Sequence, residues 1–109
     1  LIKDMPQALD YVIIEADGAK HHSLKYPAAD EPVIYPGTTD VIIVLGTWEK
    51  GRQCKDVVFR YELMQKELGT AEDAVVDDSV IEMLRQVYVR KLRDSGFEGR
   101  ILSCLAKNC

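Results

Sequence analysis

Two carboxylates and a glycine at the end of an apolar run are the residues of this chain best suited to chemistry. Glu15, Asp17 and Gly18 come directly after Tyr11–Ile14, four apolar or aromatic residues in succession. Such a run is typical of a strand buried on both faces of a parallel sheet, and ligands bind these sheets at the carboxyl ends of the strands. A carboxylate there can hold Mg²⁺, and a glycine lets the backbone approach a ligand. The same residues also suit an ordinary Asp-Gly turn.

Basic residues follow this acidic strand end at once. Lys20, His21, His22 and Lys25 lie in a long connection over residues 17–39, which carries three prolines and no helical period. A basic loop beside carboxylates could hold a phosphate against a metal ion, and loops of this length are often functional. The alternative is a solvated loop whose charges only favour solubility.

The connection is also where we expect a partner or ligand to be recognised. The adjacent His21 and His22 diverge in an extended chain, so a metal site there would need further ligands, and both are instead candidate partner contacts, as is Tyr35. The apolar segment Pro32–Tyr35 either docks a partner or packs on the core. We expect packing, because prolines brace the loop.

A second loop has the spacing of a phosphate-binding P-loop but not its chemistry. Gly46–Gln53, GTWEKGRQ, shows the G-x-x-x-x-G pattern after an apolar strand. Arg52-Gln53 then stands where Lys-Ser/Thr belongs, and Trp48 and Glu49 crowd a loop that should present bare amides. We interpret it as an ordinary glycine-containing loop.

The elements that must position these residues form an α/β order. Unbroken apolar runs predict strands over 11–16, 41–45 and 100–105, and apolar residues at helical spacing predict helices over 56–68 and 79–95. Ser79 and Glu82 form a capping-box pattern at the start of the second helix. We therefore expect a small, mostly parallel sheet flanked by helices.

Composition limits the classes of function. The 109 residues are 47% hydrophobic and carry a net charge of −4, which fits one small domain and favours neither nucleic acid nor an anionic membrane as a partner. We find no run long enough to span a bilayer. Cys54, Cys104 and Cys109 are an odd count without CxxC pairs, which indicates reduced thiols and a cytoplasmic location. We treat 1–109 as one domain, either alone or as the C-terminal part of a longer protein.

The stretch Val12–Gly46 resembles the selenium-dependent molybdenum hydroxylase accessory proteins, which look like P-loop nucleotidases. The similarity rests on Glu15-Ala16-Asp17-Gly18, on Lys20 and Leu24-Lys25, and on the spacing from these to Glu31-Pro32-Val33-Ile34 and the next strand. Weaker similarity continues through Arg60–Leu63 and Leu68-Gly69, and through Ser95–Cys104.

The resemblance implies roles for particular residues. Asp17 would be the acidic residue on the Mg²⁺ side with Glu15 as its neighbour, Gly18 would lie near a terminal phosphate, and Lys20 and Lys25 would contact phosphate or a partner. It implies the later part of a P-loop nucleotidase fold and a role in cofactor or selenium insertion into a molybdenum hydroxylase.

The chain departs from that family in two respects that bear on activity, of which one is that no obvious N-K-x-D base-recognition motif occurs before Ser95. Family members carry a glycine-rich phosphate loop with Lys-Thr upstream of the acidic strand, and no such loop occurs here. We therefore expect this chain alone not to hydrolyse ATP or GTP, and Mg²⁺ and a nucleotide to bind only in a longer parent chain. The hypotheses that stay open are a maturation factor, a non-catalytic interaction domain, and a stand-alone Mg²⁺-dependent phosphoryl enzyme.

Overall fold

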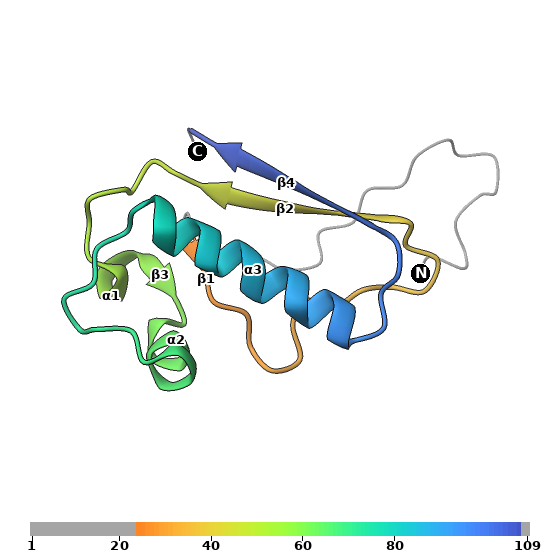
Figure 1. Cartoon of the computed structure of the whole chain (residues 1–109), viewed down its shortest axis with the longest axis horizontal. Coiled ribbons are helices and arrows are strands. Elements are labelled where there is room, and N and C mark those ends of the chain that lie inside the picture. The colour runs from red at the N-terminus through yellow and green to blue at the C-terminus, as the bar shows by residue number, and fades with distance from the viewer. Residues whose placement is uncertain (1–23, 108–109) are drawn as a thin grey trace.

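A computed structural model describes residues 24–107 as an α/β structure with two parallel strand pairs (Figure 1). The strand predicted over 11–16 lies outside the described residues. The elements in chain order are β1 (Leu24–Lys25), β2 (Asp40–Gly46), α1 (Cys54–Val57), β3 (Val58–Phe59), α2 (Tyr61–Leu68), α3 (Asp78–Asp94) and β4 (Arg100–Ala106). β1 pairs with β3, and β2 pairs with β4.

The pairing of β2 with β4 confirms two of the predicted strands and their parallel direction. The register runs without a bulge from Asp40 opposite Arg100 to Gly46 opposite Ala106. Side chains alternate across the pleat, so Ile43 and Leu45 are buried on one face of β2. Figure 1 shows α3 running along this pair of strands.

The other face of the β2–β4 pair is exposed among the described residues. Ile42 and Val44 are 60% and 62% exposed, and Leu102 on β4 is 42% exposed. These three residues share one face, because they occupy even positions in the matched register. Within residues 24–107 the apolar run of β2 therefore has cover on only one side, and on β4 even Leu105, which pairs with the buried Leu45, is 61% exposed.

The helix predicted over 56–68 is wrong in its first part, because a strand interrupts it. α1 ends at Val57, β3 occupies Val58–Phe59, and α2 begins only at Tyr61. β-branched and aromatic side chains favour extended backbone, and here the main chain of Val58 and Phe59 pairs with β1. The predicted apolar stripe is still correct in α2, where Tyr61 and Met64 are buried.

The helix predicted over 79–95 is confirmed as α3, but its predicted cap is wrong. Asp77 is the N-cap, and its carboxylate accepts hydrogen bonds from Val80 N–H at 2.9 Å and from the Ser79 hydroxyl at 2.6 Å. Glu82 instead accepts from Arg85 Nε at 2.8 Å. Asp77 and Ser79 both carry side-chain oxygens near the start of the helix. Asp77 comes earlier in the chain, and its carboxylate is the one that accepts from a free backbone amide of the first turn. The apolar residues Ile81, Leu84, Val87 and Leu92 bury the inner side of the helix.

The connection over residues 17–39, which we expected to be irregular, contains β1. Its later part packs on the core. Tyr26 and Pro27 are buried directly after β1. Ile34 is partly buried against the core, where it lines a hollow of about 270 Å³ together with Phe97. Packing of this segment, as we expected, is therefore what the structure shows. None of the helices within residues 24–107 has the length and apolar character to cross a membrane.

We predict that Ile34→Ala lowers the free energy of unfolding by about 1–2 kcal/mol, less than for a fully buried isoleucine. Half-burial of the side chain is the reason. The neighbouring Val33 is 49% exposed, so Val33→Ala should stay within about 0.5 kcal/mol of the native protein. Urea unfolding measures both, and equal effects would show that this segment does not pack as described.

Candidate functional site

Most of the site residues predicted from sequence lie outside the described part of the chain. These are Glu15, Asp17, Gly18, Lys20, His21 and His22. Lys25 and Tyr35 are described. The roles proposed for all eight residues remain predictions.

Lys25 is buried and ion-paired at the carboxyl end of β1. Its ammonium donates to Glu31 Oε2 at 2.8 Å, and its side chain is only 5% exposed. Glu31 Oε1 accepts a hydrogen bond from Ala28 N–H at 3.0 Å. A buried charge is costly unless it is paired, so Glu31 is what allows Lys25 to lie inside. The pair also ties the turn after β1 back to that strand.

Phe59 and Arg60 extend this cluster from the end of β3. Arg60 Nε lies 3.6 Å from Glu31 Oε1, and its guanidinium lies 5.0 Å from the centre of the Phe59 ring. The Lys25 ammonium lies 5.5 Å from the same ring. Both cations are attracted to the ring by its quadrupole. Since β1 and β3 are parallel, these side chains meet at the carboxyl ends of two strands, where α/β folds bind ligands. We call Lys25, Glu31, Phe59 and Arg60 the rim cluster.

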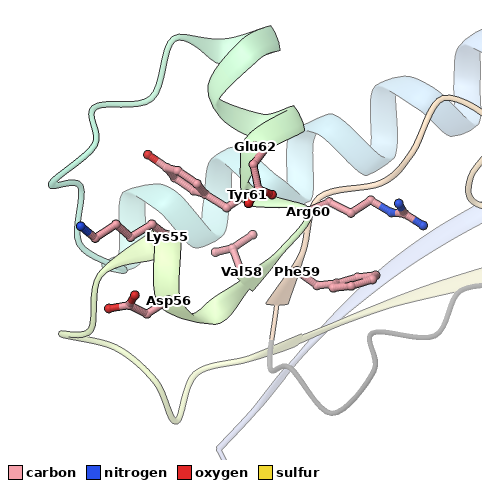
Figure 2. Close-up of a pocket in the computed structure, with 7 residues that line it drawn as sticks. All are labelled: Lys55, Asp56, Val58, Phe59, Arg60, Tyr61 and Glu62. Carbon is pink, nitrogen blue, oxygen red and sulfur yellow. The ribbon is translucent and has the colours of Figure 1, made fainter.

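A hollow of about 400 Å³ adjoins the rim cluster at the start of α2. Figure 2 shows Phe59 and Arg60 extending to one side of it and Lys55 and Asp56 to the other. Val58, Tyr61 and Glu62 complete its lining. The hollow carries both signs of charge.

The carboxyl group of Glu31 has a lowered pKa. Its partial burial would raise the pKa, but the hydrogen bonds from Lys25 and from Ala28 N–H and the charges of Lys25 and Arg60 together lower it. Glu31 is therefore ionised throughout the neutral range and holds both cations.

Tyr26 anchors the rim cluster to α2. Its N–H donates to the carbonyl of Phe59 at 2.9 Å, and its hydroxyl donates to Glu67 Oε1 at 2.7 Å. Burial, and then the contact with Glu67, raise the pKa of Tyr26 to about 12. The buried tyrosine therefore stays neutral and holds β1, β3 and α2 together.

The Gly46–Gln53 loop is not arranged as a phosphate cradle. Gly51 N–H donates to the carbonyl of Val76 at 2.9 Å, and Lys50 and Arg52 N–H donate to carbonyls within the loop. The carbonyl of Arg52 accepts in return from Val76 N–H at 2.8 Å. These amides therefore have protein acceptors, which agrees with the interpretation of this segment as an ordinary loop.

Within residues 24–107 no group of three or more His, Cys, Asp or Glu side chains is placed to hold a metal ion. Cys54 is fully buried, and burial raises the pKa of its thiol, so it is a packed side chain rather than a reactive thiolate. Cys104 is exposed, and neither of these two cysteines forms a disulfide.

Comparison with protein families decides what this chain is related to. The family model described as YqeC protein matches residues 1–62, which is more than half of the chain. The chain belongs to this family. Comparison with curated proteins and with solved structures returned no match. The part that matches the YqeC family begins at residue 1, includes the predicted acidic strand end, β1, β2, α1 and β3, and reaches the first residues of α2.

Three residues of the rim cluster, Glu31, Phe59 and Arg60, were not predicted from sequence as site residues of this YqeC family member. Phe59 and Arg60 fell inside a predicted helix, where their side chains would have pointed in unrelated directions. The Val58-Phe59 pair was the available signal, because two residues of high strand propensity precede a charged residue. Recognising it as a strand would have placed Arg60 at a strand end.

Proposed function

We propose that this protein is an accessory factor in the maturation of a selenium-dependent molybdenum hydroxylase. The observation that supports the proposal is the YqeC family match over residues 1–62. That range includes Glu15-Ala16-Asp17-Gly18, on which the resemblance to hydroxylase accessory proteins rests. The partner would be the hydroxylase or its cofactor-maturation machinery, in the cytoplasm.

In this proposal the acidic residues act in a longer parent chain. Asp17 and Glu15 would hold Mg²⁺, Gly18 and Lys20 would face the phosphates of a nucleotide, and a phosphate loop would come from elsewhere in the parent. The described residues supply the sheet, its helix and the rim cluster. Lys25 supports the fold through Glu31, which makes Lys20 the cleaner lysine to test.

The experiment is complementation in cells that produce this protein and the hydroxylase. Deleting the gene should lower hydroxylase activity to background at unchanged hydroxylase protein, and the native gene should restore it. Asp17→Asn and Lys20→Ala should fail to restore it. Asp73→Asn, the same change at an exposed aspartate between α2 and α3, is the matched control and should restore it fully.

A non-catalytic interaction domain is the second candidate, and one observation favours it. The Gly46–Gln53 loop, which has P-loop spacing, uses its amides on the protein itself. Full rescue by Asp17→Asn, together with loss of rescue by Lys20→Ala, would support this candidate. Normal hydroxylase activity in the deletion strain would refute the maturation role.

A further inference from the structure

Arg60 has a backbone conformation that arginine rarely adopts. It follows β3 directly with φ 66° and ψ 38°, in the left-handed region, and it is the one non-glycine residue with positive φ within residues 24–107. Glycine takes this conformation without steric conflict, whereas a side chain makes it unfavourable. An unfavourable conformation of this kind often accompanies a side chain that must be held in a particular place.

The Arg60 side chain is held at one nitrogen and at one face. Nε faces Glu31 at 3.6 Å, and the guanidinium carbon lies 5.0 Å from the centre of the Phe59 ring. Within residues 24–107, neither terminal nitrogen donates a hydrogen bond, and the side chain is 39% exposed. In Figure 2 the guanidinium lies at the end of an extended side chain, away from Lys55 and Asp56. The terminal nitrogens therefore belong to a partly exposed side chain that is oriented by Glu31 and Phe59.

The surroundings favour an anion with several oxygens. The Lys25 ammonium lies 2.8 Å from Glu31 and balances its negative charge. The rim cluster therefore keeps one net positive charge, that of Arg60. α2 begins at the next residue, and there the Arg60 carbonyl accepts from Leu63 N–H at 3.1 Å and Met64 N–H at 3.2 Å, so of the first-turn amides at most those of Tyr61 and Glu62 could face a ligand. The hollow is also lined by the carboxylates of Asp56 and Glu62. They would repel a large anionic surface, so the ligand that fits is a compact anion.

We propose that Arg60 is the ligand-binding residue of a site for a phosphate-type oxyanion at the carboxyl ends of β1 and β3. The planar fork of arginine matches two oxygens of such a group. Glu31 and Phe59 are positioning residues, because they hold the guanidinium without occupying its terminal nitrogens. The proposal concerns binding by this chain itself and does not depend on the maturation role.

The test is a titration of the ¹⁵N-labelled 109-residue chain with inorganic phosphate, pyrophosphate and metal-free ATP, followed by amide chemical shifts. We expect saturable shifts centred on Phe59–Glu62. Arg60→Gln should raise the dissociation constant about tenfold or more, and Arg60→Lys, which keeps the charge but loses the fork, about threefold or more. Tightest binding of inorganic phosphate identifies a free anion as the ligand, whereas tighter binding of pyrophosphate and ATP identifies a phosphoryl chain.

Arg85→Gln is the matched control, because Arg85 pairs with Glu82 on the exposed side of α3. The dissociation constant of the Arg85→Gln variant for each of the three ligands should stay within about twofold of the value for the native chain. If Arg60→Gln does not fold, Arg60→Gly relieves the backbone and removes the same fork. No saturation of the native chain by about 10 mM ligand, or equal weakening by Arg60→Gln and Arg85→Gln, would overturn the proposal.

Discussion

Replacing Glu31 with glutamine is expected to lower the free energy of unfolding by about 2–3 kcal/mol at neutral pH. The change keeps the shape of the side chain but removes the charge that faces the buried Lys25 ammonium and Arg60. Urea unfolding of the native chain and the variant measures the difference. Glu82→Gln is the control, because its partner Arg85 is partly solvated and the exposed pair contributes little.

The same variant has a characteristic dependence on pH. The pKa of Glu31 is lower in the folded protein than its usual value of 4.5. Its contribution to stability is therefore complete above the unfolded pKa and is lost as pH falls through the folded pKa. The gap in unfolding free energy between native and Glu31→Gln should narrow below about pH 4.5. A gap that stays constant down to about pH 3 would contradict the ion pair as its cause.

Leu84→Ala is expected to destabilise the protein by about 3–4 kcal/mol, because its side chain is completely buried between α3 and the sheet. The matched control is Leu102→Ala on β4, where the leucine is 42% exposed on the outer face of the sheet. That change should stay within about 0.5 kcal/mol of native.

This comparison also tests the exposed face itself. A cost above about 2 kcal/mol for Leu102→Ala would mean that the residue is buried in the folded protein in solution. The outer side of β2 and β4 would then be covered. A small cost would leave the face open, as residues 24–107 show it.

The sequence predicted β2, β4 and α3 because each has one dominant pattern. Val41–Leu45 is apolar without interruption, and the stripe on residues 81–92 keeps one period over three turns. The prediction of one continuous helix over residues 56–68 failed, because Val57, Tyr61, Met64 and Leu68 fit a single helical period although a strand interrupts them. The pairing of Val58 and Phe59 with β1 overrode that local pattern.

The rim cluster could be predicted only in part, for a related reason. Lys25 was a candidate from its place beside the acidic strand end, but its partner Glu31 depends on the turn after β1. Arg60 reaches the same place only because β3 pairs with β1 in the observed register. Contacts fixed by strand pairing across more than thirty residues leave no periodic signal in the sequence.

The parallel pairing of β2 with β4 has a consequence for the order in which the chain becomes complete during synthesis. Asp40 and Arg100, which face each other at the start of the two strands, are sixty residues apart. At about 5–20 residues per second, a ribosome needs about 3–12 s to make the intervening segment. For that time the apolar strand β2 exists without the neighbour it has in the finished fold. During that stage the unpaired edge of β2 is open to pairing with other chains, which is the condition that favours aggregation of newly made proteins.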